Sequence, residues 1–275
     1  MLTGTRLAFI GGGNMAESLL AGLLRKGVAT AEQIAVSDPQ SDRRKLLAER
    51  YRVAVQADNR AAVRGTELVV LCVEPQVLDT VLTELTPSLK AQPLLISVAA
   101  GYPLSRLQAQ LKTTRLVRAM PNTPSTIGEG VTALSVMPGL SSEDQNRARR
   151  LFESVGQVVV VEERLMDAVT GLSGSGPAYV FAMIEALADG GVLMGLPRAT
   201  AQLLAAQTLA GAARMILEQG IHPAVLKDRV ASPGGTTISG LSRLEQGRLR
   251  ATLMSAVAAA TQRSQELGQE EGHGL

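Results

Sequence analysis

The feature that most limits which fold this chain can adopt is a short apolar run that leads directly into a glycine-rich turn. Residues 6–10 are followed by GGGNMA at residues 11–16, which fits the pattern G-x-G-x-x-A, and a helical pattern continues from there through Leu24. Such glycines permit a tight turn and let the backbone approach a pyrophosphate, while the alanine allows close packing of helix on strand. The free N–H groups of the helix N-terminus favour phosphate. The sequence therefore predicts a dinucleotide-binding site at residues 11–16.

The same alternation of apolar run and helical pattern recurs through the first half of the chain. Runs typical of strands occur at residues 34–37, 68–73, 94–98 and 115–120, each followed by a helical pattern. Because parallel strands need crossover connections, this order predicts a doubly wound parallel sheet of the Rossmann type, in an α/β protein. After a last run at residues 158–161, no further runs typical of strands occur. We therefore expect a dinucleotide-binding domain over residues 1–162.

The second half is predicted to be all-helical. Helical patterns cover residues 178–194, 198–219, 223–230, 236–246 and 248–267, with glycine- and proline-rich breakers between them. The first two are apolar and rich in small residues on more than one face, which favours a subunit interface over a helix sandwiched within one chain. We expect a helical dimerisation and substrate domain over residues 163–275, whose last residues, 268–275, form a frayed polar tail.

Composition excludes several classes of function. The chain of 275 residues carries 27 Lys and Arg against 25 Asp and Glu, and these charges are interspersed, so nothing predicts a nucleic-acid-binding surface. No run of about 18 apolar residues predicts a membrane span, no signal peptide is evident, and we expect a cytoplasmic protein. One cysteine and two histidines form no cluster with metal-ligand spacing, so no metal site is predicted.

The identity of the dinucleotide stays open at this point. Asp38 ends the second strand, where a carboxylate binds a ribose 2′-hydroxyl and repels a 2′-phosphate, which favours NAD. Arg43 and Arg44 follow within one helical turn and offer charge to a 2′-phosphate, which favours NADP, although such a pair also suits a solvated helix face. The strand ends at residues 72–75 and 97–101 point to the same cofactor edge.

A second glycine-containing turn lies in the helical half. The letters SPGGTT at residues 232–237 precede a helical pattern, so the first N–H groups of that helix are available to hold a carboxylate, with the Thr237 hydroxyl beside them. The sequence predicts an anion pocket that includes a proton donor. An ordinary N-capped loop is the alternative.

Several segments together carry a family resemblance. These are the glycine turn, MPNTP at residues 120–124, GLSGSGPA at 171–178, ADGG at 188–191, and the stretch 223–245 around SPGGTTI. On these motifs the chain resembles the pyrroline-5-carboxylate reductase family over nearly its whole length. The resemblance implies NAD(P)H-dependent reduction of the cyclic imine 1-pyrroline-5-carboxylate to L-proline, the last step of proline biosynthesis. It also implies NADP(H) or NAD(H) as cofactor, and a homodimer or a dimer-based higher oligomer.

The resemblance also implies roles for individual residues. Substrate contacts fall on Val230, Ser232, Gly234, Gly235, Thr236 and Thr237, with Thr237 as the catalytic residue. The resemblance places cofactor contacts on Gly11, Gly12, Gly13, Asn14, Met15, Asn59, Cys72, Val73, Glu74, Pro75, Ser97, Ala99, Ala100 and Gly101. To these we add Asp38 and Arg43, which follow the second strand.

The chain departs from the family pattern at three positions. The family often has lysine where Glu74 stands, a polar residue where Arg229 stands, and a neutral residue where Asp38 stands. The first and third departures bear on the contact with the cofactor phosphate.

Two other functions share parts of this sequence pattern. A β-hydroxyacid dehydrogenase or another imine reductase would carry a lysine as acid/base in the helical half, where the chain has only Lys227, which suits a solvated helix face. A dinucleotide-sensing scaffold would keep the glycine turn without needing Thr237. For the reductase, we expect an iminium substrate whose nitrogen is hydrogen-bonded by Thr237, and whose carboxylate is held by N–H groups of residues 234–236 and the Ser232 hydroxyl.

Overall fold

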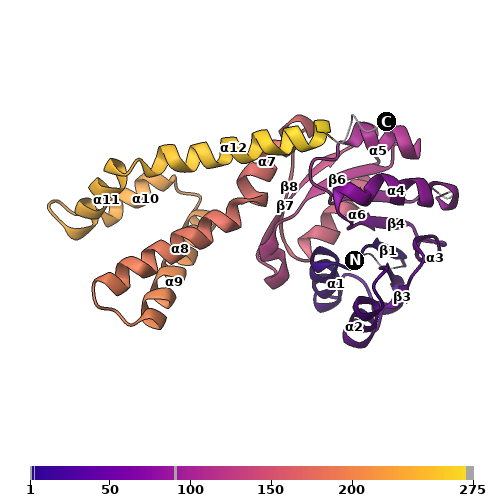
Figure 1. Cartoon of the computed structure of the whole chain (residues 1–275), viewed down its shortest axis with the longest axis horizontal. Helices are drawn as coiled ribbons and strands as arrows, with labels where there is room; N and C mark the ends of the chain where they lie inside the picture. Colours follow the sequence, from indigo (N-terminus) through magenta and orange to yellow (C-terminus); the bar gives the residue numbers. More distant parts are fainter. Residues whose placement is uncertain (1, 3, 90–91, 271–275) are drawn as a thin grey trace. The chain divides into compact units, whose positions relative to one another are not determined.

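The structure is a computed structural model that describes residues 2, 4–89 and 92–270 (Figure 1). It divides into two compact units: residues 1–175 together with 259–275, and residues 176–258. The chain leaves the first unit after residue 175 and returns to it at residue 259. The boundary expected from the sequence, after residue 162, differs from this division of the chain by contacts, and as a statement about independently folding domains it stays a prediction.

The first unit is built on one eight-stranded sheet with strand order β3-β2-β1-β4-β5-β6-β7-β8. All neighbouring strands are parallel except β6 and β7, which are antiparallel. The doubly wound sheet predicted from the sequence is confirmed. The strands are β1 (Leu7–Ile10), β2 (Ile34–Ser37), β3 (Ala54–Gln56), β4 (Leu68–Leu71), β5 (Leu94–Ser97), β6 (Leu116–Met120), β7 (Gly130–Val136) and β8 (Gly156–Val160).

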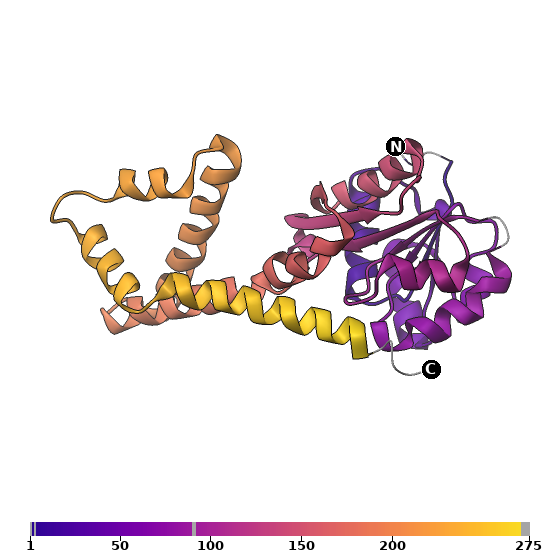
Figure 2. The ribbon, with the colours of Figure 1, turned by 90° about the horizontal axis from the view of Figure 1, so that it is seen from above.

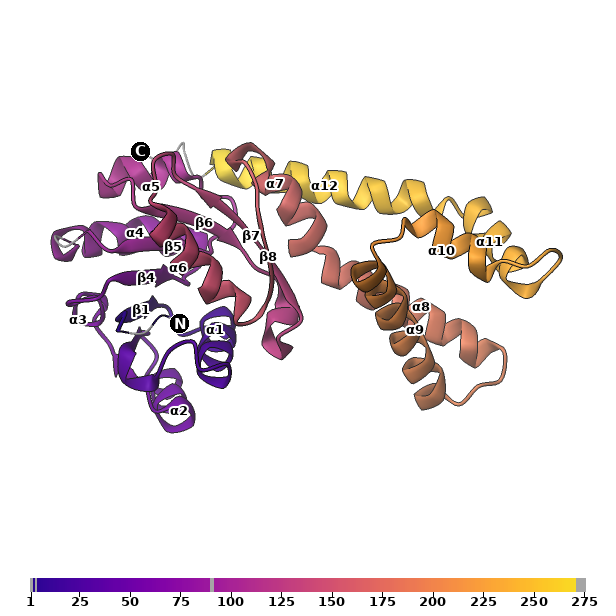
Figure 3. The same cartoon turned by 180° about the vertical axis from the view of Figure 1, so that it is seen from behind.

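Helices cover both faces of this sheet, because successive side chains of its central strands point to opposite sides. Leu7 and Phe9 of β1 join one buried cluster and Ala8 and Ile10 the other. The first cluster takes in α1, α2 and α6, and the second takes in α3, α4 and α5 (Figure 3). The helices of this unit are α1 (Asn14–Arg25), α2 (Ser41–Tyr51), α3 (Asn59–Ala62), α4 (Pro75–Leu85), α5 (Leu104–Leu111), α6 (Ser142–Glu153), α7 (Met166–Val169) and, from residue 259 on, the last part of α12 (Leu249–Glu270).

Short turns of other helix types complete the first unit. Four are 3₁₀ turns and the fifth is a π-helical turn that follows α7 directly. They are η1 (Ala31–Gln33), η2 (Thr86–Ser88), η3 (Thr123–Ile127), η4 (Glu163–Leu165) and η5 (Thr170–Gly174).

The second unit is all-helical, as predicted (Figure 2). Its helices are α8 (Gly176–Leu193), α9 (Arg198–Gln219), α10 (Pro223–Val230), α11 (Thr236–Gln246) and the first part of α12 (Leu249–Glu270). Helices α8 and α9 pack on each other through Ala188, Ala201 and Ala205, whose small side chains let the backbones approach. Helix α12 continues to Glu270, past the predicted end at 267, and residues 271–275 of the predicted tail lie outside the described residues.

Within residues 2, 4–89 and 92–270, no helix combines the length and the apolar character that crossing a bilayer requires.

Candidate active site

The carboxyl ends of four parallel strands lie in line in the first unit. Ile10 is paired in register with Ser37 and with Leu71, and Leu71 is paired with Ser97, so β1, β2, β4 and β5 all end at the same level. In open α/β sheets, ligands bind outside this edge. The cofactor residues predicted from the sequence follow or belong to these strand ends or to the helices that start there, except Asn59, which begins α3 after β3.

The glycine turn after β1 has the geometry that its sequence predicts. Gly11 has φ +90°, and a Cβ there would lie 2.7 Å from the Cys72 carbonyl oxygen, so only glycine fits. A Cβ on Gly12 would lie 2.8 Å from a Leu47 methyl group. Gly13 precedes α1, and apart from Gly13 and its two chain neighbours no atom of the described residues lies within 4 Å of where its Cβ would be.

The N-terminus of α1 is open to an anion. In the part of the chain that the structure describes, no side chain caps this helix, whose first turn contains Asn14 and Met15. Its first N–H groups therefore have no intrahelical acceptor and no side-chain acceptor. This open, glycine-lined helix start fits the pyrophosphate of a dinucleotide.

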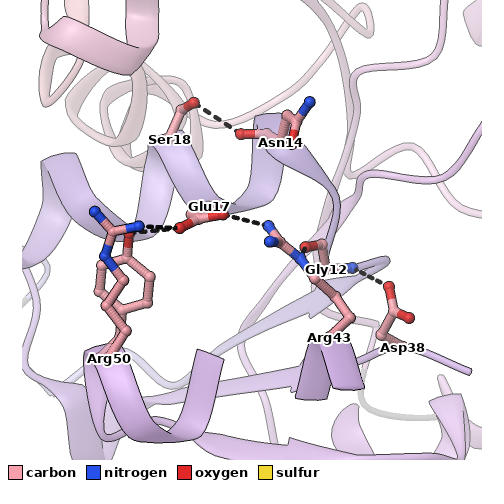
Figure 4. A network of polar contacts seen from close by, with 8 residues as sticks. Gly12, Asn14, Glu17, Ser18, Asp38, Arg43 and Arg50 are labelled. Atoms are coloured by element: carbon pink, nitrogen blue, oxygen red, sulfur yellow. Dashed lines mark hydrogen bonds and ion pairs between the residues drawn. The ribbon is translucent and has the colours of Figure 1, made fainter. Parts of the chain in front are cut away.

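Asp38 stands directly after β2, beside this turn. One of its carboxylate oxygens, Oδ2, accepts a hydrogen bond from the Gly12 N–H (2.9 Å), and the other, Oδ1, accepts one from the Gln40 N–H (2.9 Å). These two bonds hold the carboxylate at the strand edge, and Figure 4 shows the one from Gly12.

Neither of the two predicted phosphate-binding arginines has a freely extended side chain. Arg43 donates from Nε to the Gly12 carbonyl and from Nη2 to Glu17. Arg44 donates from Nη1 to the carbonyl oxygens of Asp38 (2.7 Å) and Pro39 (2.8 Å).

The remaining strand ends bring further predicted residues to the edge. Asn59 begins α3, accepts a hydrogen bond from the Ser37 hydroxyl (2.7 Å) and donates one to Glu84 (2.9 Å). Ser97 ends β5, and its hydroxyl oxygen accepts the Ala99 N–H (3.3 Å). Ala100 follows, and Gly101 takes a left-handed φ of +71°.

The segment after β4 combines an inert thiol with a helix start. The Cys72 N–H donates to the Ile10 carbonyl (2.7 Å), and burial raises the pKa of its thiol far above the usual range, so the thiol is neutral. Val73 packs against the second buried cluster. Glu74 precedes α4, and Pro75 occupies its first turn, where the missing N–H of proline costs nothing.

The predicted substrate residues lie in the second unit. Val230 ends α10, and Ser232 and Gly234 lie in the turn before α11. The Gly235 N–H donates to the Ser232 carbonyl (3.0 Å), and a Cβ on Gly235 would lie 2.2 Å from the Ser232 hydroxyl oxygen, so a larger residue there would require that side chain to move. The turn is closed around Gly234, whose φ is +66°.

Thr236 and Thr237 form the first turn of α11. Among the described residues no side chain caps this helix, so its first N–H groups are open to an anion, as they are in α1. The structure thus brings the predicted cofactor residues together in one unit and the predicted substrate residues together in the other.

Sequence reasoning missed three residues next to the glycine turn: Glu17, Arg50 and Tyr51. Glu17 Oε2 accepts from Arg43, and Glu17 Oε1 accepts from Arg50 (2.9 Å) and from the Tyr51 hydroxyl (2.9 Å). The sequence did contain a signal for Glu17, because an acidic residue in the first turn of the predicted phosphate-binding helix places negative charge where an anion is expected to bind.

The fold and the open glycine turn together define a dinucleotide-binding protein of the Rossmann class with a second, helical unit. Residues 6–101 match the family model described as NADP oxidoreductase coenzyme F420-dependent. Residues 163–267 match the model for pyrroline-5-carboxylate reductase dimerisation.

Individual relatives match over almost the entire chain. A pyrroline-5-carboxylate reductase of Synechocystis sp. is 50% identical over 96% of this chain and 99% of its own length. One of Arabidopsis thaliana is 46% identical, with 96% of each chain covered. The solved structure of the Coxiella burnetii enzyme superimposes with a TM-score of 0.90 at 37% identity, covering 96% of this chain and 98% of that one. The chain belongs to the pyrroline-5-carboxylate reductase family.

Proposed function

We propose that this protein catalyses the NAD(P)H-dependent reduction of 1-pyrroline-5-carboxylate to L-proline, the last step of proline biosynthesis. The observation that carries the proposal is the match to reductases of this name over 96% of the chain, at up to 50% identity. Two open helix starts support it, since the reaction needs one anion site for the dinucleotide and one for the substrate carboxylate.

The cofactor site fits NADP(H) or NAD(H), which supplies the hydride when bound. The N–H groups at the start of α1, next to Gly13, Asn14 and Met15, would hold the pyrophosphate. A Plasmodium falciparum relative, 31% identical with a TM-score of 0.87, is described with NADP bound. The strand-end segments after β4 and β5 would line the rest of the dinucleotide.

The substrate residues belong to the turn before α11 and to its first turn. We assign the carboxylate to the N–H groups of residues 234–236 and the Ser232 hydroxyl, and the ring nitrogen to the Thr237 hydroxyl. A C=N carbon accepts a hydride more readily when its nitrogen is protonated or hydrogen-bonded, because an amide anion is a poor product. Thr237 is too weak an acid to supply a large general-acid effect, so its role is to orient the imine and relay a proton.

A homodimer, or a higher oligomer built from dimers, is the expected assembly. The helical half matches the dimerisation model of the family, and large apolar side chains of α8 and α9 lie exposed in the single chain. Burying them against a second copy would remove them from water. The cytoplasmic location is a prediction that fractionation of the source cells tests.

The direct test is to mix the purified protein with 1-pyrroline-5-carboxylate and follow the oxidation of NADPH and of NADH in separate reactions. Oxidation that depends on the imine, with proline as the product, is the expected result. The reverse assay, proline-dependent reduction of the oxidised cofactors at high pH, separates this function from a hydroxyacid dehydrogenase. Absence of turnover in both directions would contradict the proposal.

A further inference from the structure

A carboxylate that the proposed reaction does not use lies beside the dinucleotide site. Glu17, in the first turn of α1, accepts hydrogen bonds from Arg43, Arg50 and Tyr51, all of α2. Its side chain is mostly buried, with 17% of its surface exposed. Figure 4 shows Arg43 between Glu17 and Gly12, with Asp38 beyond Gly12.

Glu17 is charged in this setting. Burial alone would raise its pKa, but the hydrogen bonds from Arg43 and Tyr51 and the charges of Arg43 and Arg50 outweigh burial and hold the pKa of the carboxyl below its ordinary value. At neutral pH the carboxylate therefore offsets positive charge next to the glycine turn.

The charged Glu17 carboxylate fixes the position of the Arg43 side chain. Its guanidinium is committed at Nε to the Gly12 carbonyl and at Nη2 to Glu17, which draws the group toward the turn and α1. A 2′-phosphate gains most from an arginine whose planar edge is free for two parallel hydrogen bonds. With Nε and Nη2 committed, the edge that these two nitrogens form is not free for a phosphate, and the rest of the guanidinium is held next to the Glu17 carboxylate.

Asp38 lies on the other side of Gly12, at the end of β2, where a ribose of the dinucleotide is expected. Two backbone N–H groups fix its carboxylate at the end of β2, and an ionised carboxylate has about four acceptor positions, so two remain for ribose hydroxyls. A phosphate on the same ribose would instead meet a like charge at close range.

We propose that Glu17 and Asp38 are specificity-determining residues that weaken the binding of NADPH relative to NADH, Asp38 directly and Glu17 by holding Arg43 on the glycine turn. The proposal rests on the dinucleotide site proposed above and assigns Glu17 a positioning role. It needs no contact between Glu17 and the cofactor.

Glu17→Gln tests the positioning role, because it keeps the shape of the side chain and removes the charge that holds Arg43. The binding of NADPH and of NADH is measured separately by calorimetry without the imine. We expect NADPH to bind about 3- to 10-fold more tightly, as suits one partly screened charge interaction, while NADH changes by less than about twofold. An unchanged ratio of the two affinities, or weaker binding of NADPH, would overturn the role of Glu17.

A double-variant cycle separates positioning from a general effect on α1. In an Arg43→Leu background, Glu17→Gln should no longer improve NADPH binding, because the gain passes through Arg43. A gain that persists without Arg43 would overturn the mechanism. Glu49→Gln is the matched control, since it makes the same chemical change on exposed α2 surface, where Glu49 lies 4.0 Å from Lys45, and should leave both affinities as they are.

Asp38→Asn keeps the proposal testable if Glu17→Gln fails to fold. It should weaken NADH and strengthen NADPH, so that the affinity ratio shifts toward NADPH by about tenfold or more. A ratio that does not move would overturn the proposal. Because these measurements need no turnover, failure of the reductase function and failure of this inference give different results: the first shows no imine-dependent oxidation, and the second shows unaltered cofactor selectivity.

Discussion

The two units of this chain bury their apolar side chains to very different degrees. In the first unit, two large clusters of fully buried residues lie on the two faces of the sheet. In the second unit, the buried cluster consists of Ala188, Ala201 and Ala205 with Ile184 and Val192 beside it. Large side chains there stay exposed, among them Phe181 at 63% and Leu203 at 68%.

This contrast indicates two sources of stability. The first unit gains its stability from its own core, as a doubly wound sheet covered on both faces does. Helices α8 to α11 bury few large side chains among themselves, and we expect them to depend on a surface supplied by the proposed second copy. Four predictions follow from this contrast, beginning with the largest expected effect.

Phe9→Ala should weaken the first unit most. Phe9 is fully buried in the cluster formed with α1 and α6, so its removal loses transfer free energy and leaves a cavity. We expect the free energy of unfolding to fall by about 3–5 kcal/mol. Urea unfolding at fixed protein concentration measures this, and a loss below about 1 kcal/mol would contradict the core assignment.

Phe181→Asp should separate the proposed dimer without unfolding the first unit. An exposed aromatic side chain of α8 is a strong candidate for an interface anchor, and its loss should cost at least about 2 kcal/mol of association. Sedimentation velocity over a dilution series measures the shift toward monomer. Leu46→Asp, on exposed α2 of the first unit, is the control and should keep the assembly of the unsubstituted protein. If both variants shifted equally toward monomer, or if neither did, the exposed apolar side chains of the second unit would not form the dimer interface.

Thr237→Ala should separate chemistry from cofactor binding. The substitution lies in the second unit, so NAD(P)H should bind as before while turnover falls about tenfold, which corresponds to about 1.4 kcal/mol in the barrier. Steady-state kinetics with 1-pyrroline-5-carboxylate measures turnover and the Michaelis constant. If both constants stay unchanged, the residue has no role in the reaction.

The smallest expected effect is on the pH dependence of stability, through the ion pair between Arg115 and Asp144. Burial alone would raise the pKa of Asp144, but paired hydrogen bonds from Arg115 (2.9 Å each) and its charge hold that pKa below its ordinary value. The pair therefore stabilises the first unit above about pH 4, the ordinary carboxyl pKa, and this stability is lost as pH falls through the lowered folded pKa.

Asp144→Asn should lower stability at pH 7 by about 1 kcal/mol and flatten its acid dependence. Urea midpoints at pH 7 and pH 3 measure both quantities. Asp189→Asn, which breaks the exposed pair of Asp189 with Arg198 in the second unit, should change neither by much. A larger loss of stability from Asp189→Asn than from Asp144→Asn would contradict the prediction that the partly buried pair contributes more than the exposed one.

Strongly patterned elements were predictable from the sequence. Helices α9, α10 and α11 have the predicted bounds, because proline and glycine mark their ends and apolar residues fill their length. Strands β3 and β7 were missed. β3 has three residues, too few for a periodicity, and β7 mixes Thr132 and Ser135 with apolar residues.

The candidate site was predictable to a similar extent. The turns at residues 11–16 and 232–237 are local, so glycine and helix-start signals reveal them. The partners of Arg43 were not predictable, because Glu17 and Gly12 lie 26 and 31 residues away in the chain, and nothing local shows which way a long arginine side chain bends.

The sequence by itself determined the parallel sheet, the dinucleotide turn, the helical second half and the family, because each depends on short patterns that local backbone chemistry enforces. Only the tertiary structure decided that Glu17, Arg43 and Asp38 meet around Gly12. Packing α2 beside α1 at the end of β2 brings Arg43 within hydrogen-bonding distance of Glu17, and both Arg43 and Asp38 within hydrogen-bonding distance of Gly12; the charge that a 2′-phosphate would meet depends on that packing.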